Sequence, residues 1–349
     1  MVDANNTLPM ALSMGDPAGI GPEIILKAFA SSPQTMRGCC VFGNAQVMSQ
    51  AMAYLPKAMA SLITLVPVAD VPSAMALPMG HVPVCSVTPD APMALGEPSA
   101  SGGRMAADAV VASAQAALRS QVAAVITAPL HKKALAMAGV NHPGHTELLQ
   151  SLAADHLGCT VAELPVRMML SRPGLRVVLV SIHVPLREAI EQVTHDQVLQ
   201  TLVVTDRAWV QMHGHRPKVW VAGLNPHAGE EGLFGQEEIQ AISPAVASAC
   251  ALGMTVKGPF PPDTVFMQAL LSQGSDKPDV VVAMYHDQGL IPVKLQGLAD
   301  GVNQTLGLPF VRTSPDHGTA FDIAGQGLAD PASLLCAVAE ARRCANLIV

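Results

Sequence analysis

Apolar residues occur along the chain in short β-branched runs that alternate with Ala-rich stretches. The clearest runs of strand length lie at 176–181, 218–223 and 279–284. These runs are continuously apolar rather than alternating, which is typical of strands covered on both faces of a sheet. The order of the elements predicts an α/β protein with a mostly parallel sheet.

The same pattern predicts further elements outside these three runs. Strands are expected at 8–13, 122–127 and 308–311, and helices at 24–30, 104–119 and 148–154. A turn with the sequence MGDPAGIGPE, at 14–23, joins the first strand to the first helix. Residues 66–103 carry many prolines and glycines and predict a long surface excursion.

Composition narrows the possible functions. Half of the 349 residues are hydrophobic, only 13% are charged, and 20 Lys and Arg against 27 Asp and Glu give a net charge of −7. A nucleic-acid surface needs clustered cations, so it is not expected. No apolar run approaches the roughly 18–20 residues of a membrane span, and the first residues show no secretory pattern. The seven scattered cysteines predict reduced thiols, so we expect a cytoplasmic protein without nucleic-acid or membrane partners.

Three of the predicted strands are followed by histidines. His183, His227 and His286 come after the runs at 176–181, 218–223 and 279–284. Ligands of α/β proteins bind beyond the carboxyl ends of parallel strands, so these imidazoles could supply three ligands to one divalent ion. The alternative is that each histidine is a hydrogen-bonded loop residue, and the pattern alone does not decide between the two. Imidazole suits Zn²⁺ or Co²⁺ better than Mg²⁺.

Neither common phosphate-binding motif, GxGxxG or GxxxxGK[ST], is present. Lys294 and Arg312, together with Asn303, could hold a phosphate in a chain that is poor in cations. The alternative is that both cations are ordinary solvated side chains. Thr146 could cap the helix expected at 148–154, or it could contact an anion at the start of that helix.

Eight ordered motifs extend these arguments. They are MGDPAGIGPE (14–23), TAPLHKK (127–133), GHTELL (144–149), SIHVPL (181–186), GLNPHAGEE (223–231), GPFPPDTVF (258–266), YHDQGLIPVK (285–294) and NQTLGLPFVRTSPDHGTAFDIAG (303–325). On these motifs the chain resembles the 4-hydroxythreonine-4-phosphate dehydrogenase family of pyridoxal phosphate (vitamin B6) biosynthesis.

The resemblance implies a fold and a domain division. The fold would be the two-domain one of isocitrate and isopropylmalate dehydrogenases, which bind NAD without a GxGxxG motif. Residues 1–130 and 302–349 would form the NAD-binding domain, and residues 131–301 the metal-binding and dimerisation domain.

The resemblance also implies roles for particular residues. His183, His227 and His286 would bind a divalent metal at a homodimer interface, with one histidine supplied by the partner chain. Zn²⁺ is expected first, with Mg²⁺ or Co²⁺ as alternatives. The other implied site residues are His145, Thr146, Lys294, Asn303 and Arg312 for substrate, and His317, Gly318, Asp322 and Ile323 for NAD. Asp263 and Lys294 are the catalytic candidates; for Asp263 a loop cap is the alternative, and Asp287 could orient the ring of His286.

The implied activity is an oxidative decarboxylation. The C3 hydroxyl of 4-phosphohydroxy-L-threonine would be oxidised with NAD, or NADP, and the resulting β-keto acid would lose CO₂ to give 3-amino-2-oxopropyl phosphate. The first alternative is a dehydrogenase of a related acid, threonate or erythronate 4-phosphate. Two others are a non-catalytic metal- or phosphate-binding module and a phosphate acyl or acetyl transferase.

Overall fold

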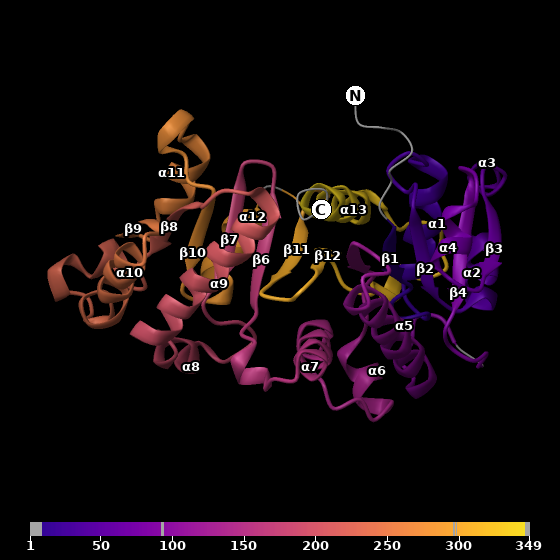
Figure 1. The fold of residues 1–349 in the computed structure, drawn as a ribbon, viewed down its shortest axis with the longest axis horizontal. Coiled ribbons are helices and arrows are strands. Elements are labelled where there is room, and N and C mark those ends of the chain that lie inside the picture. The colour runs from indigo at the N-terminus through magenta and orange to yellow at the C-terminus, as the bar shows by residue number, and fades with distance from the viewer. Residues whose placement is uncertain (1–8, 92–93, 296, 298, 346–349) are drawn as a thin grey trace. The chain divides into compact units, whose positions relative to one another are not determined.

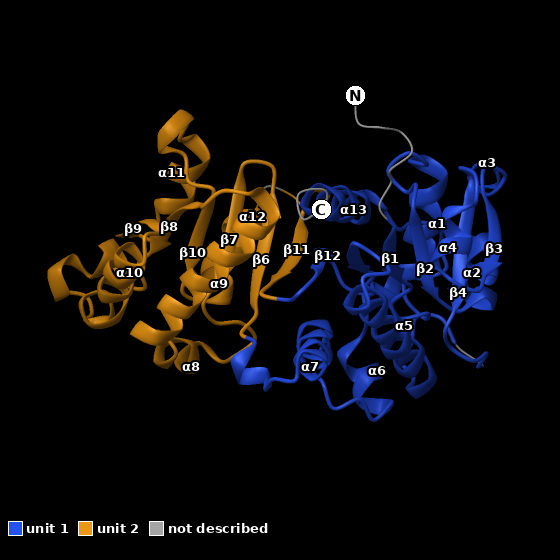
Figure 2. Ribbon diagram, viewed as in Figure 1, with its two compact units in different colours: residues 1–164, 308–347, 349 blue, residues 165–307, 348 orange. Residues whose placement is uncertain are grey.

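The computed structural model describes residues 9–91, 94–295, 297 and 299–345 (Figure 1). The chain forms two compact units, coloured separately in Figure 2. Unit 1 contains residues 1–164 and 308–347, and unit 2 contains residues 165–307. The first unit is therefore discontinuous, and it includes residues 131–164, which the expected division had assigned to the middle domain.

Unit 1 is built on a parallel sheet with strand order β3-β4-β2-β1-β5-β12. Its strands are β1 (Met10–Ser13), β2 (Cys39–Gly43), β3 (Thr64–Val68), β4 (His81–Ser86), β5 (Ala124–Thr127) and β12 (Val311–Pro315). The strands expected at 8–13 and 122–127 are confirmed as β1 and β5, although Leu8 lies outside the described residues.

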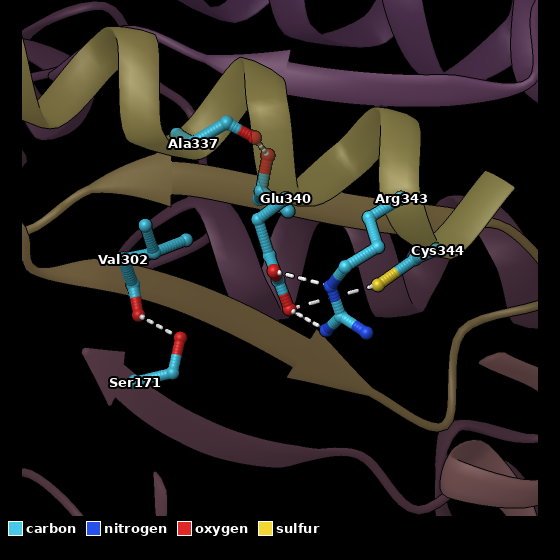
Figure 3. Close-up of polar contacts among 7 residues, drawn as sticks. Ser171, Val302, Ala337, Glu340, Arg343 and Cys344 are labelled. Carbon is cyan, nitrogen blue, oxygen red and sulfur yellow. Dashed lines mark hydrogen bonds and ion pairs between the residues drawn. The ribbon is translucent and has the colours of Figure 1, made fainter. Parts of the chain in front are cut away.

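The helices of unit 1 pack on this sheet or on one another. They are α1 (Gly21–Ser31), α2 (Ala45–Ala51), α3 (Lys57–Ala60), α4 (Val71–Met75), α5 (Ala100–Leu118), α6 (Lys132–Met137), α7 (His145–Leu157) and α13 (Ala332–Ala345), with short helices η1 (Met52–Tyr54), η2 (Val161–Glu163) and η6 (Phe321–Ile323). Helix α5 begins four residues earlier than expected because the Ser99 side chain accepts from the backbone N–H of Gly102. On α13, Glu340 and Arg343 form an ion pair (Figure 3).

Three expectations for unit 1 are wrong. Residues 66–103 are not a surface excursion, because β3, α4 and β4 occupy much of this range. A proline inside each of the two strands interrupts the apolar run that would have indicated a strand. The strand expected at 308–311 is a turn, because Gly307 has a φ of +93° and Pro309 lacks an N–H, so β12 begins only at Val311. Thr146 does not cap α7, because Gly144 occupies the cap position.

Unit 2 has the strand order β11-β6-β7-β10-β8-β9. Its strands are β6 (Arg167–Arg172), β7 (Leu175–Leu179), β8 (Lys218–Ala222), β9 (Thr255–Phe260), β10 (Val280–Ala283) and β11 (Val302–Leu306). The pairs β11–β6 and β6–β7 are antiparallel, and the remaining pairs are parallel. The Ser171 hydroxyl donates to the Val302 carbonyl at 3.3 Å (Figure 3). The three strands expected before His183, His227 and His286 are confirmed as β7, β8 and β10.

The helical elements of unit 2 are α8 (Leu186–Glu191), α9 (His195–His213), α10 (Ser243–Ala251), α11 (Val265–Leu271) and α12 (His286–Lys294), with η3 (Pro226–Gly232), the π-helical η4 (Glu238–Ile242) and η5 (Gly274–Asp276). Helices α11 and α12 supply Phe266 and Leu290 to a buried core shared with β7 and β10. A Cβ at Gly289 would lie 2.5 Å from a methyl of Leu179, so this glycine permits close packing of α12 on β7. None of the described helices is both long and apolar enough to span a bilayer.

Candidate functional site

His183 and His286 lie together at the carboxyl edge of the unit 2 sheet. They follow β7 and β10, which are neighbouring parallel strands. Beyond these strands, the Val180 N–H donates to the Ala283 carbonyl at 2.9 Å, and the Ser181 hydroxyl donates to the Met284 carbonyl at 3.0 Å. The two imidazole centroids are 5.5 Å apart, and both rings line a cavity of about 190 Å³. This geometry suits two imidazoles that share one ligand.

Asp287 contacts the ring of His286. Its Oδ1 atom lies 2.6 Å from Nδ1 of His286, which leaves Nε2 of that ring available to a ligand. A carboxylate in this position fixes the orientation and tautomer of a metal-binding imidazole. The contact that the sequence suggested for Asp287 is therefore present, and the donor set fits a divalent metal ion.

His227 adopts an unusual backbone on η3. Residues 227–231 all have positive φ, with His227 at +53°, and His183 has a φ of +52°. A left-handed conformation costs a non-glycine residue on the order of 1–2 kcal/mol, and such strain concentrates at functional sites. His227 lies 6.2 Å from Phe234, centroid to centroid. In the part of the chain that the structure describes, no three His, Cys, Asp or Glu residues are grouped as a metal site, so a single chain groups His183 with His286 only.

A buried carboxylate holds the start of the turn that carries His227. Glu238 is only 3% exposed. Its Oε1 accepts from the backbone N–H groups of Leu224 and Asn225 at 2.7 and 2.8 Å, and its Oε2 accepts from the Asn225 side chain at 2.9 Å. Burial alone would raise the pKa of Glu238, but these donors together lower it below its ordinary value, so the group is ionised at neutral pH. Glu238 is not among the residues that the sequence pattern singled out.

Gln288 connects the loops that follow β8 and β10. Its side-chain amide donates to the Gly223 carbonyl at 2.8 Å, and its Oε1 accepts from the Met284 N–H at 2.7 Å. The segments before His227 and His286 are therefore joined through one side chain. Gln288 lies within the YHDQGLIPVK motif, but the sequence pattern did not single it out either.

Arg312 is a buried cation in unit 1. It lies inside β12 and is 4% exposed. Its Nη2 donates to Oγ1 of Thr127, at the end of β5, at 2.7 Å. Burial lowers the pKa of Arg312 to about 10, and the negative charge of Glu147 opposes this shift. The guanidinium stays charged at neutral pH, so Arg312 is not one of the solvated surface cations that the sequence left as an alternative.

His145, the first residue of α7, lies near the Arg312 charge. Burial lowers its pKa well below 6.5, and the Arg312 charge lowers it further, while a hydrogen bond to the Ala128 backbone opposes both effects. The ring is therefore neutral at pH 7. Its buried Nε2 and the buried Oδ1 of Asn303, on β11 of unit 2, have no hydrogen-bond partner among the described residues. Buried polar atoms are rarely unpaired in folded proteins, so both are suited to a polar ligand.

The segment expected to bind NAD is held by the MGDPAGIGPE turn. The Ile20 N–H donates to the Thr319 carbonyl at 3.0 Å, and a Cβ at Gly19 would lie 2.8 Å from the same oxygen. A cavity of about 300 Å³ lies beside this contact and is lined by Gly19, Tyr54 and Gly325, among others. Of the expected NAD residues, His317 has a buried Nε2 with no partner among the described residues, Gly318 and Asp322 are exposed, and Ile323 ends η6.

Two other candidates are exposed, and one buried group was missed. Asp263 and Lys294 both have exposed side chains, on the turn before α11 and at the end of α12. Asp16 is fully buried. Burial raises the pKa of Asp16, opposed by a hydrogen bond from the Ala18 N–H and by the charge of His131. From the sequence, Asp16 is predicted only as part of a turn.

Comparisons with known proteins identify the class. The family model described as pyridoxal phosphate biosynthetic protein PdxA matches residues 35–341. The chain is 47% identical to a 4-hydroxythreonine-4-phosphate dehydrogenase of Beijerinckia indica, covering 96% of this chain and 94% of that one. It is 42% identical to a D-threonate 4-phosphate dehydrogenase of Salmonella typhimurium, covering 95% and 97%. The crystal structure of a 4-hydroxythreonine-4-phosphate dehydrogenase from Klebsiella pneumoniae superposes with a TM-score of 0.83 at 39% identity, covering 97% and 99%.

The fold and the comparisons define an α/β dehydrogenase, an oxidoreductase. The chain belongs to the PdxA family, whose model matches most of its length. The resemblance inferred from the eight motifs is thereby confirmed.

Proposed function

We propose that this dehydrogenase oxidises the C3 hydroxyl of 4-phosphohydroxy-L-threonine with NAD, and that the resulting β-keto acid loses CO₂ to give 3-amino-2-oxopropyl phosphate. The observation that carries the proposal is the His183–His286 pair, with its rings 5.5 Å apart beside a cavity and Asp287 on one ring. The 47% identity to a relative of that name supports the substrate.

The metal would be held by His183 and His286 of one chain, with His227 supplied by a partner chain. Zn²⁺ is the first candidate, with Co²⁺ or Mg²⁺ as the alternatives. Imidazole nitrogen favours Zn²⁺ and Co²⁺ over Mg²⁺. A bound divalent ion would act as a Lewis acid toward the substrate hydroxyl, and bound NAD would accept the hydride. Asp287 would keep Nε2 of His286 directed at the ligand by accepting a hydrogen bond from Nδ1 of that ring.

Each unit carries polar groups that are candidates for binding the substrate. In unit 1, Arg312 offers a charged guanidinium to the phosphate, Thr146 offers a hydroxyl, and His145 offers a neutral ring nitrogen that can accept a hydrogen bond. In unit 2, Asn303 offers an unpartnered amide oxygen and Lys294 an exposed ammonium. Asp263 is the candidate general base, with Lys294 as the second catalytic candidate.

NAD would bind at the segment containing His317, Gly318, Asp322 and Ile323. The neighbouring cavity of about 300 Å³ and the contact between Gly19 and Thr319 support this assignment. Under this proposal, residues 1–130 with 302–349 have the cofactor role and 131–301 the metal and dimerisation roles.

A homodimer is supported by apolar side chains beside residues 227–231, which have positive φ and are called the His227 turn below. Leu233 is 74% exposed, and Phe234 and Ile239 are about half exposed. Contiguous exposed apolar groups of this kind mark interaction surfaces. Light scattering should give a dimer for the wild type and a monomer for Phe234→Asp, whereas Leu157→Asp, at an exposed leucine on α7, should stay dimeric. A monomeric wild type would contradict the proposal.

The second candidate is oxidation of D-threonate 4-phosphate, favoured by the 42% identity to a relative of that name. The decisive experiment measures NADH formation from the amino and non-amino substrates by the Zn²⁺-loaded protein, with and without a chelator. We expect faster turnover of 4-phosphohydroxy-L-threonine and loss of activity on chelation. Turnover of D-threonate 4-phosphate alone would replace the main proposal with the second candidate.

A further inference from the structure

The His227 turn is an unfavourable backbone conformation that needs support from outside the turn. Four of its five residues with positive φ are not glycine, namely His227, Ala228, Glu230 and Glu231. Inside the turn, three backbone N–H groups donate at 3.1 Å, Ala228 to the Asn225 carbonyl, Leu233 to the Glu230 carbonyl and Phe234 to the Gly229 carbonyl. L-residues favour right-handed backbone, so four non-glycine residues with positive φ make this conformation costly even with these local bonds, and contacts from outside the turn help to hold it.

Glu238 supplies such contacts at the start of the turn. Its carboxylate accepts three hydrogen bonds, two from the backbone of Leu224 and Asn225 and one from the Asn225 side chain. A carboxylate that accepts several N–H groups fixes their direction, because the bonds are charge-assisted. The same carboxylate lies under the turn itself, since a Cβ at Gly229 would come within 2.7 Å of Oε2.

The element that carries Glu238 is also irregular. Glu238 is the first residue of the π-helical segment η4, and such segments occur frequently at functional sites. Glu238 is buried, whereas its neighbours Glu237 and Ile239 are not. A buried carboxylate is costly unless its hydrogen bonds are satisfied, and the donors of Leu224 and Asn225 satisfy those of Glu238.

We propose that Glu238 is a positioning residue that holds the His227 turn in its left-handed conformation and so presents the His227 imidazole to the metal. The inference rests on the proposed function for the role of His227. Glu238 does not itself contact the ligand. It acts through the backbone of Leu224 and Asn225, three and two residues before His227.

The chain offers a matched control one residue away. Glu237 also accepts a hydrogen bond from the Asn225 side chain, at 2.7 Å. Among the described contacts, its carboxylate accepts none from a backbone N–H of the turn. Glu238→Gln and Glu237→Gln are the same chemical change. In Glu238→Gln, an amide N–H₂ would face the donors of Asn225, whereas Glu237→Gln leaves the backbone contacts intact.

The first experiment measures hydrogen exchange of the metal-free full-length protein. We expect the amides of Leu224 and Asn225 to exchange at least tenfold faster in Glu238→Gln than in the wild type or Glu237→Gln, with exchange in α9 unchanged. Equal exchange in all three proteins would overturn the proposal. If Glu238→Gln does not fold, Asn225→Ser removes the side-chain bonds to Glu237 and Glu238 and leaves the two backbone donors in place. The same acceleration at Leu224, relative to Glu237→Gln, is expected with a smaller amplitude, and an unchanged rate there would also overturn the proposal.

The second experiment measures Zn²⁺ affinity by calorimetry. We expect Glu238→Gln to bind Zn²⁺ at least tenfold more weakly than Glu237→Gln, and excess Zn²⁺ to restore its turnover, which it would not do for His227→Ala. Wild-type affinity in Glu238→Gln would overturn the proposal. If wild type and His227→Ala bind Zn²⁺ equally, the proposed role of His227 fails instead, and the exchange experiment still decides whether Glu238 holds the turn.

Discussion

Lys27 and Glu23, one turn apart on α1, form a buried ion pair with Nζ and Oε1 2.9 Å apart. Both groups also bond to the chain beyond η6. Lys27 donates to the carbonyls of Gly327 and Ala329 at 2.8 and 2.7 Å, and Glu23 accepts from the Ala329 N–H at 2.9 Å. Because Glu23 ends the MGDPAGIGPE motif, the pair joins that motif to the end of the segment expected to bind NAD.

Lys27→Met should therefore affect stability and cofactor binding together. The variant keeps the apolar stem but leaves Glu23 buried without its cation, which typically costs about 3–5 kcal/mol. We expect the KM for NAD to rise roughly tenfold, or about 1.4 kcal/mol, with a smaller change in the KM for substrate. Urea unfolding and steady-state kinetics measure the two effects.

Lys57→Met is the matched control, since Lys57 is exposed on α3. A substitution at such a position changes the free energy of unfolding by no more than about 0.5 kcal/mol. Loss of stability in Lys27→Met with an unchanged KM for NAD would show that the pair supports the fold but not the cofactor segment.

Arg312→Lys tests the phosphate role without removing the charge. Lysine cannot reproduce the planar fork, and Arg312 already uses Nη2 on Thr127. We expect the KM for the phosphorylated substrate to rise roughly tenfold or more, equivalent to about 1.4 kcal/mol, with a smaller loss of kcat. Lys294→Ala should raise the same KM, whereas Lys257→Ala, at an exposed residue of β9, should not. A KM that stays unchanged in Arg312→Lys would remove Arg312 from the phosphate site.

The strands that form the sheet centres could be predicted because burial on both faces leaves a continuous apolar run, as at β7 and β10. The strands β3 and β4 could not, because Pro67 and Pro83 interrupt that run. The edge position of β3 tolerates a missing N–H, whereas β4 lies between β3 and β2 and carries Pro83 nonetheless. The turn before β12 was mistaken for a strand because Leu308 and Phe310 are apolar. Periodicity alone does not reveal that Gly307 and Pro309 turn the backbone.

The candidate site could be predicted only where the functional side chains directly follow neighbouring strands of the sheet. His183 and His286 meet because their strands are adjacent and parallel, which the sequence pattern suggested. Glu238 could not be found this way, because its partners lie 13 and 14 residues away across an irregular turn. The signal that could have identified it is the pair of glutamates at 237–238, close after the GLNPHAGEE motif.

The proposed metal site predicts different losses of Zn²⁺ binding for substitutions of the two histidines and of Asp287. His183→Ala and His286→Ala should abolish Zn²⁺ binding and turnover, while His215→Ala, at an exposed residue beyond α9, should change neither. Asp287→Asn should weaken Zn²⁺ binding about 10–100-fold, as loss of a ligand-orienting carboxylate commonly does. Calorimetry with Zn²⁺ and the rate of NADH formation measure these effects. Full activity of both alanine variants after chelation would refute the metal mechanism.

The lowered pKa of His145 predicts how the folded state responds to acid. In the unfolded chain this ring takes up a proton near its ordinary pKa of 6.5, whereas in the folded chain it does so only at lower pH. Below about pH 6.5 the unfolded state therefore binds more protons, and the free energy of unfolding falls as the pH falls towards the folded-state pKa. His145→Asn replaces the titrating ring with a side chain that does not titrate. The difference in the free energy of unfolding between wild type and variant should therefore be constant above about pH 7.5. It should shift in favour of the variant as the pH falls below about 6.5. Urea unfolding of both proteins across this range tests the sign, and a difference that does not vary with pH would mean that the ring is not held neutral by burial and by Arg312.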